Sequence, residues 1–178
     1  MRSARAYTLE KFAAECHGIL SADPGPKGRE KVRSLLKKVL VDKEFVAETF
    51  PPSNTEKRKI IYEDKDLGFC ICSHFHEGAA MSKPHDHGKY WAIYGQVEGT
   101  TEMFDYKWVE KPSREDVSGK VEALRSYTLK PGDAHLYNEG DVHAPKREAT
   151  TKLVRIEGRN LDTIKRVYHE EVASAPAE

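Results

Sequence analysis

The sequence predicts a mainly β protein with a helical N-terminal segment, and three observations carry this prediction. Up to about residue 57, apolar residues recur at the spacing of a helical face, whereas the chain from residue 58 onward is a series of short β-rich runs. Turn signals separate these runs, and no helical pattern lies between them. The 178 residues are enough for one domain with a real core. A sandwich or a small barrel around one ligand-sized cavity fits these features.

Two helical patterns precede the strands. The first runs from Thr8, which is placed to cap it, to Leu20, and a Pro-Gly-Pro segment at residues 24–26 breaks it. The second follows to Leu40 and continues in pieces toward Phe50, before two prolines end the helical part. The basic residues at 27–38 alternate with apolar ones, so we interpret them as the solvated face of this second helix.

The β-rich part contains seven runs that favour strands, because β-branched and aromatic residues are concentrated in them. These runs are Lys59 to Tyr62, Gly68 to His76, Tyr90 to Val97, Thr100 to Val109, Val121 to Leu129, Ala134 to Tyr137 and Lys152 to Gly158. Turns are expected at 63–66, 77–80, 98–99, 111–119, 131–133 and 139–141. We therefore divide the chain into a helical segment (1–57), a barrel (58–162) and a C-terminal extension (163–178) that is partly disordered, all within one structural domain.

Composition excludes several classes of partner. The 29 basic and 29 acidic side chains cancel, which gives no reason to expect nucleic acid or a membrane surface and favours a small-molecule ligand. No apolar run is long enough to span a membrane, and the first residues lack the pattern of a signal peptide, so a cytoplasmic location is expected. The chain has an odd number of cysteines, Cys16, Cys70 and Cys72, and no Cys-x-x-Cys spacing. This argues against a disulfide framework and against a structural zinc site.

The most informative feature is the pair His85 and His87. Residues two apart on an extended chain point to the same side, so this pair can deliver two imidazoles into one cavity as part of a metal site. A third ligand must come from elsewhere, and His135 and His143 are the main candidates in the second half of the barrel.

Two motifs in this region resemble those of the cupin superfamily. The first cupin motif has Gly, His-x-His, Glu and Gly, and the chain offers Gly78, the His pair, Ala92 and Gly99. The second has two glycines and a His, and Gly132, Gly140 and His143 stand at its spacing. The resemblance covers roughly residues 58–162. It implies a double-stranded β-helix, the jelly-roll barrel of cupins, with His143 as the third metal ligand.

Ala92 stands where many cupins place a carboxylate ligand. In this respect, and in its helical N-terminal segment, the chain is similar to the thiol dioxygenases, the cysteine and 3-mercaptopropionate dioxygenase group, which hold Fe(II) with three histidines. That resemblance implies an iron-dependent enzyme that adds O₂ to the sulfur of a small thiol and forms a sulfinic acid. Nickel, manganese and zinc accept the same ligands.

The resemblance also suggests how a substrate is held. Arg58 lies at about the place of the arginine that pairs with the substrate carboxylate in cysteine dioxygenase; the alternative is a solvated arginine after a linker. The late strand departs from that family, because Arg155 and Glu157 replace its His and Tyr. These two share one strand face, so they point either into the barrel, where they would act on a polar substrate, or to solvent.

Other side chains are weaker candidates. His74 and His76 share a strand face with Cys70 and Cys72 and either line the mouth of the pocket or have a structural role. Tyr90 and Tyr94 follow the His pair; they are either barrel core or donors of a hydroxyl to a bound ligand. The loop residue Met81 could form an apolar wall. The remaining histidines, His17 and His169, lie outside the barrel and are expected at the surface.

Two classes of function stay open at this point. One is an iron-dependent dioxygenase whose partners are a small thiol or carboxylate and O₂. The other is a cupin that uses its pocket differently, as a metal-dependent isomerase or lyase or as a binding protein without turnover. Cupins often pair through strand edges, so a homodimer is a further expectation.

Overall fold

The computed structural model describes residues 7–173, and three helices come first in it. They are α1 (Leu9–Ala22), α2 (Pro26–Leu40) and α3 (Lys43–Thr49). The Thr8 side chain accepts a hydrogen bond from the Lys11 amide, 3.1 Å away, and so caps α1 as predicted. Asp42 caps α3 in the same way, which explains why the helical pattern restarts after α2.

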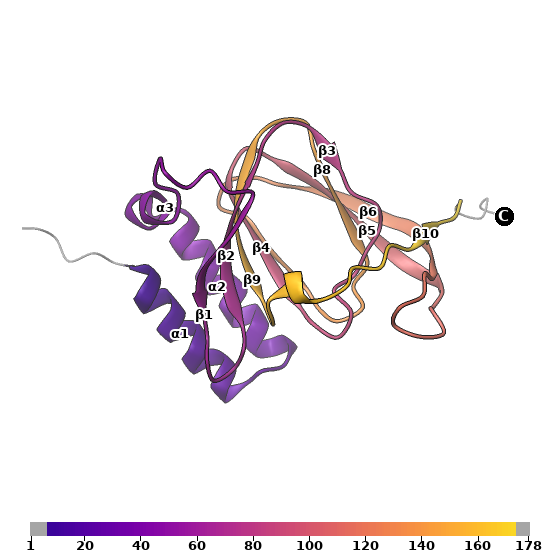
Figure 1. Ribbon diagram of the computed structural model, residues 1–178, viewed down its shortest axis with the longest axis horizontal. Helices are drawn as coiled ribbons and strands as arrows, with labels where there is room; N and C mark the ends of the chain where they lie inside the picture. The colour runs from indigo at the N-terminus through magenta and orange to yellow at the C-terminus, as the bar shows by residue number, and fades with distance from the viewer. Residues whose placement is uncertain (1–6, 174–178) are drawn as a thin grey trace, which may run out of the picture.

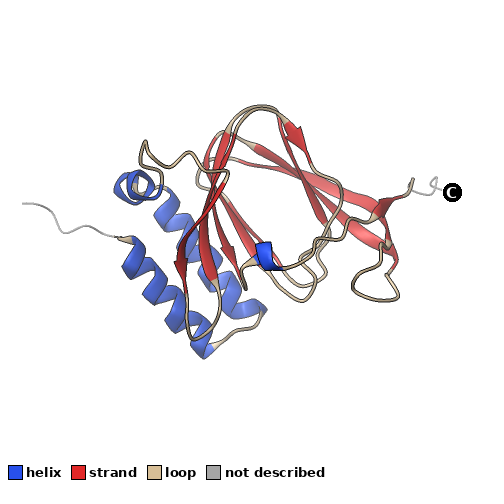
Figure 2. Cartoon of the chain, viewed as in Figure 1, coloured by secondary structure: helices blue, strands red, loops and turns tan. Residues whose placement is uncertain are grey.

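The strands form two five-stranded sheets (Figures 1 and 2). The first sheet has the order β1-β2-β9-β4-β7 and the second β10-β6-β5-β8-β3. Their bounds are β1 (Arg58–Glu63), β2 (Cys70–His76), β3 (Ala80–Met81), β4 (Ala92–Glu98), β5 (Thr101–Glu110), β6 (Lys120–Leu129), β7 (Ala134–Tyr137), β8 (His143–Arg147), β9 (Thr151–Glu157) and β10 (Glu170–Glu171).

The strand order is that of a double-stranded β-helix. The late strand β9 lies between β2 and β4, and β8 lies between β5 and β3, so each sheet interleaves strands from both halves of the barrel. All pairs are antiparallel except β10 with β6. The predicted fold class, a mainly β jelly-roll barrel with a helical N-terminal segment, is confirmed.

The helices cover the outer face of the first sheet (Figure 1). The largest apolar cluster lies between them, and it contains Leu36, Ile71, Ile93, Val154 and Ile156. Strand residues alternate between the two faces, so the neighbours of these side chains point into the barrel instead. Full burial of each such side chain contributes roughly 1.5–3 kcal/mol. The inner face of this sheet carries polar residues such as Arg155 and Glu157 beside a smaller apolar cluster that includes Ala92 and Leu153.

Several local expectations differ from the structure. His85 makes only isolated β-bridges, to His143 and Tyr168, so the His pair lies on an extended connection rather than on a regular strand. The flanking Pro84 and a glycine at 88 prevent a longer ladder there. Strand β8, which contains Pro145, was not predicted, and β3 begins within a predicted turn.

The C-terminal extension is described as far as Ala173, with a short 3-10 helix, η1 (Leu161–Thr163), and strand β10. The rest of the tail that was expected to be disordered, residues 174–178, lies outside the described residues. The three cysteines are free, in agreement with the expected lack of a disulfide framework, and all three are buried. Within residues 7–173, no helix is both long and apolar enough to cross a membrane.

Candidate metal centre

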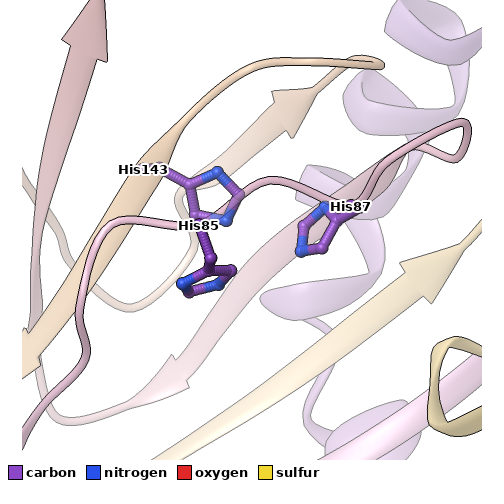
Figure 3. A group of neighbouring side chains, drawn as sticks. All are labelled: His85, His87 and His143. Carbon is purple, nitrogen blue, oxygen red and sulfur yellow. The ribbon is translucent and has the colours of Figure 1, made fainter. Parts of the chain in front are cut away.

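Three histidines converge inside the barrel (Figure 3). One ring nitrogen from each of His85, His87 and His143 lies within 4.8 Å of those of the other two. All three side chains are buried, and His143 has no exposed surface at all. Two ligands come from the connection before β4 and the third from the first residue of β8, so residues far apart in sequence meet at one point.

Backbone contacts orient two of these rings. His85 Nδ1 lies 2.9 Å from the Lys83 carbonyl oxygen, and His143 Nδ1 lies 2.9 Å from the Asp141 carbonyl oxygen. A carbonyl only accepts, so in both rings Nδ1 carries the proton and Nε2 keeps a free lone pair. The main chains of His85 and His143 also exchange two hydrogen bonds, of 3.0 and 2.9 Å. This pairing fixes the two residues against each other.

The protonation of the cluster suits a cation. Burial lowers the pKa of His85 to about 4, and it lowers the pKa values of His87 and His143 well below the ordinary histidine value. All three imidazoles are therefore neutral at neutral pH and have lone pairs to donate. Neutral imidazoles are the usual ligands of divalent transition metals, and the Nδ1–H groups of His85 and His143 are bonded to carbonyls as in such ligands, so these residues fit such an ion.

Tyr94 completes the inner end of the site. Its hydroxyl lies 3.1 Å from Nε2 of His87 and 3.1 Å from Nε2 of His143. The guanidinium of Arg155 lies over its ring, 4.3 Å from the ring centre. Tyr94 is in β4, directly opposite Arg155 in β9, so sheet register brings them together. Its hydroxyl is placed to contact a group bound at the three histidines.

A cavity of about 290 Å³ opens beside His85 and Tyr94. This volume lies at the small end of the range for ligand pockets, so it suits a small molecule. Its lining is strongly charged. Five cationic side chains and two carboxylates contribute to it: Lys57, Arg58, Arg147, Arg155 and Arg166, with Glu157 and Asp162.

Arg155 and Glu157 point into this cavity, which decides between the two orientations left open by the sequence. Glu157 Oε2 accepts hydrogen bonds from Arg58 Nη2 at 2.8 Å and from the Leu161 amide at 3.0 Å. Burial acts to raise the pKa of Glu157, but Arg155, Arg58 and the Leu161 amide outweigh it and the pKa is lowered. The carboxylate is therefore ionised and held in place.

Arg58 is already bonded to the protein. Besides Glu157, it donates to Asp162 at 2.7 Å and to Asn160 at 3.0 Å. It lines the cavity, as a substrate-binding residue must, but two carboxylates neutralise its charge. Arg58 therefore orders the loop after β9 in this structure.

The other predicted site residues are divided between the cavity and other places. His74 and His76 line the cavity from β2. Met81 is 63% exposed and does not line it. Tyr90 instead lines a second cavity, of about 230 Å³, that reaches His87, and its hydroxyl accepts a hydrogen bond from Arg159 at 3.2 Å.

His169 is buried, so its expected place at the surface is wrong. Its Nδ1 accepts a hydrogen bond from the Gly119 amide, and its Nε2 donates to Asp86, 2.8 Å away, between the two histidines of the His pair. Its amide also donates to the Pro84 carbonyl at 2.9 Å. The C-terminal strap, which we define as residues 164–171, thus fastens the connection that carries two ligands.

Sequence reasoning missed two cationic residues of the cavity. Arg147 lies four residues after His143 on β8, so strand alternation could have placed it on the same strand face as the metal ligand His143. Arg166 belongs to the C-terminal strap, and no pattern in the sequence indicates that this segment returns to the barrel mouth.

The basic run in α2 was interpreted as a solvated helix face. Arg29 is the exception, because it is buried and paired with Glu139 at 2.7 Å.

Comparison with known proteins gives similarity in fold only. No family model matches the chain, and no curated protein matches it. Similar solved structures include KdgF from a Halomonas species, with 19% identity over 60% of this chain and 82% of that one and a TM-score of 0.44. A cupin superfamily protein from Desulfitobacterium hafniense DCB-2 has 10% identity over 58% and 76%, with a TM-score of 0.40.

A conserved protein with a double-stranded β-helix domain from Klebsiella pneumoniae has 16% identity over 70% of this chain and 88% of that one, with a TM-score of 0.45. Solved structures that are similar to this chain thus include cupin superfamily proteins. All three TM-scores lie below 0.5. The strand order of this chain is that of a double-stranded β-helix. Its three buried histidines form a candidate metal centre inside that barrel.

Proposed function

We propose that this chain is an iron(II)-dependent thiol dioxygenase, which adds both atoms of O₂ to the sulfur of a small thiol and yields a sulfinic acid. The observation that carries the proposal is the ligand set. His85, His87 and His143 are neutral and buried, and Ala92, fully buried in β4, stands where a cupin carboxylate ligand would be. Among the described residues, the cluster contains no carboxylate.

A ligand set without charge leaves a bound divalent ion its full charge, which favours an anionic group such as a thiolate from the substrate. When bound, iron(II) would lower the thiol pKa and bring sulfur and O₂ together. The overall step balances without an outside reductant. The O–O bond breaks, two S–O bonds form, sulfur loses four electrons to the two oxygen atoms, and the thiol proton passes to solvent.

The chain's own residues supply position and polarity. The Tyr94 hydroxyl, 3.1 Å from two of the ligand nitrogens, is placed to donate a hydrogen bond to an oxygen or sulfur atom held there. Arg155 over the Tyr94 ring adds positive charge beside that hydroxyl. The cavity of about 290 Å³ limits the thiol to a small one. Position and electrostatics of this kind are the main contributions a protein makes to such a reaction.

The test is oxygen uptake by protein loaded anaerobically with Fe(II), with 3-mercaptopropionate, cysteine and cysteamine as substrates. We expect thiol-dependent uptake of one O₂ per thiol, with the sulfinic acid identified by mass spectrometry. His143→Ala is the control without a complete ligand set, and Tyr94→Phe should keep its iron but react at least about tenfold more slowly. Bound iron without uptake for any thiol would contradict the proposal.

One observation favours a second candidate, a metal-dependent isomerase or lyase. Glu157 replaces the family's tyrosine, and its buried Oε1 has no hydrogen-bond partner among the described residues. A carboxylate with a free oxygen in a metal-containing cavity can accept a proton from a carbon acid. Exchange of substrate C–H protons with D₂O in the absence of O₂ uptake, lost in Glu157→Gln, would favour this candidate over the dioxygenase.

A further inference from the structure

The cavity contains buried polar atoms that have no partner within residues 7–173. They are the donors Nε and Nη2 of Arg155 and Nε of Arg147, both ring nitrogens of His74, and one acceptor, Oε1 of Glu157. His74 is only 4% exposed and Arg155 only 9%. Nearly all buried polar groups in proteins are hydrogen-bonded, and a buried donor without an acceptor destabilises the fold. Several such atoms around one cavity point to a ligand that bonds to them.

These groups come from both sheets and face the same space. Arg155 in β9 stands opposite Cys72 in β2, and His74 is the next residue of β2 on the same inward face. Arg147 comes from β8 in the other sheet, and all three line the cavity beside His85. A single small molecule can therefore contact them together with His85, one of the three histidines of the cluster.

The charges around them favour an anion. Both carboxylates of the cavity, Glu157 and Asp162, are already paired with Arg58. Arg147 has no ion pair within the described part of the chain, and burial and the nearby charge of Arg155 lower its pKa. By contrast, burial of Arg58 is outweighed by its bonds to Glu157, which raise its pKa.

The free edge of Arg155 fits one chemical group in particular. Nε and Nη2 are the side of a guanidinium that donates two parallel hydrogen bonds to a carboxylate. The neighbouring Glu157 Oε1 lies 3.4 Å from Nη2 without hydrogen-bond geometry, so it does not saturate this edge. Neutral His74 adds one further N–H donor, because burial keeps its pKa well below the ordinary value.

We propose that Arg147, Arg155 and His74 form a subsite that binds the carboxylate of the substrate, in place of Arg58, which is a positioning residue for Glu157. The substrate is then an acid whose other end reaches the three histidines. An aminothiol has no carboxylate for these donors, so we expect it to bind more weakly than an acid. The evidence for the subsite is the set of unpartnered donors of Arg147, Arg155 and His74. Its assignment to a thiol substrate rests on the proposed function.

The first test measures binding without turnover. Calorimetric titration of the metal-free full-length chain with 3-mercaptopropionate should show binding that propylamine and cysteamine do not show. Arg155→Lys keeps the charge but cannot donate two parallel hydrogen bonds to a carboxylate. Arg147→Gln removes an arginine that has no ion pair with any described residue. Each change should weaken binding at least tenfold. Arg125→Gln is the matched control, since Arg125 pairs with Asp105 on the exposed part of the barrel, and it should bind like the wild type.

Circular dichroism of each variant checks that it is folded, and Arg147→Gln keeps the test valid if the Arg155 variant does not fold. No carboxylate binding at millimolar concentration, or equal binding by both variants and the wild type, would overturn the subsite. Oxygen uptake by the iron-loaded chain separates the two proposals. Carboxylate binding without uptake rejects the dioxygenase alone, whereas uptake with cysteamine as fast as with 3-mercaptopropionate rejects the subsite alone.

Discussion

At the scale of single residues, the metal centre depends on which histidine joins the His pair. The ring of His143 lies 4.8 Å from the rings of both His85 and His87, between centroids. His135 is eight residues earlier in the chain, on β7, and stacks on the ring of Tyr127 with centroids 4.8 Å apart. The spacing of the glycines indicated His143, and the structure brings His143 into the cluster.

We predict that His143→Ala loses its metal and His135→Ala keeps it. Removing one of three ligands leaves too few donors for a stable site, whereas His135 lies outside the group of converging nitrogens. Metal content after dialysis, measured by elemental analysis on Fe(II)- and Zn(II)-loaded protein, checks this. Metal lost from the His135 variant and retained by the His143 variant would show that the ligand set is wrong.

At the scale of secondary-structure elements, α2 packs unusually close to β4. A Cβ atom added to Gly95 would lie 2.8 Å from Leu36 Cδ2 and 2.9 Å from Leu40 Cδ1. A larger residue here would therefore have to displace the ends of these two leucine side chains, because the helix approaches the strand closely. This contact holds the helical layer against the strand that carries Tyr94.

Gly95→Ala should accordingly destabilise the fold by about 1–3 kcal/mol, the usual cost of forcing extra atoms into a packed core. Gly18→Ala is the matched control, because nothing lies within 4 Å of its added Cβ on α1. This change should stabilise the chain by up to about 1 kcal/mol, since alanine favours a helix over glycine. Urea unfolding followed by circular dichroism measures both, and equal stability of the two variants would contradict the packing argument.

The C-terminal strap is a second element with consequences for the site. It holds Asp86 through His169, and Asp86 lies between two of the ligands. We predict that His169→Ala weakens metal affinity by about 10- to 100-fold, the usual effect of losing a group that orients metal ligands. The control is His17→Ala, which removes a similar His–Asp contact, to Asp64 at 2.7 Å, on the helical side. Competition with a metal chelator gives both affinities, and equal losses would show that the strap does not act on the ligands.

At the scale of the whole molecule, the outer face of the first sheet is apolar where the helices cover it. Its inner face contributes charged side chains to the cavity. Tyr94, Arg155 and Cys72 form one inward row across three strands, while Ile71, Val154 and Ile93 face the helices. The arginines of the interior oppose protonation of the histidines near them. Burial, followed by Arg147, Arg155 and Lys57, lowers the pKa of His76 to about 4.

This lowered pKa predicts acid sensitivity of the metal-free chain. Between about pH 6.5 and pH 4 the unfolded chain binds protons at His76, and similarly at His74, that the folded chain excludes. Stability is then fully present above pH 6.5 and falls as the pH decreases, by at most about 1.4 kcal/mol per pH unit for each such histidine. Urea unfolding at pH 7.5, 6.0 and 5.0 measures the slope, which His76→Gln should reduce. An unchanged slope in that variant would contradict this explanation.

The local pattern of the sequence determined much of the fold and of the centre. Helical periodicity, turn signals and strand alternation are properties of neighbouring residues, and they predicted α1, α2 and most strands within a few residues. The pair His85 and His87 indicated a metal site, and the resemblance of Gly132, Gly140 and His143 to the second cupin motif implied the third ligand. Alternation also showed that Arg155 and Glu157 share a face.

Only the tertiary structure decided whether the strand face with Arg155 and Glu157 points into the barrel or to solvent. The helices cover one side of the first sheet, so the opposite face, with Arg155 and Glu157, becomes the inside of the barrel. Whether Arg58 is free or paired depends on Asp162, more than a hundred residues away, and the return of Arg166 and His169 to the site depends on the path of the C-terminal strap. Such contacts join segments that are distant in sequence, and no local pattern records them.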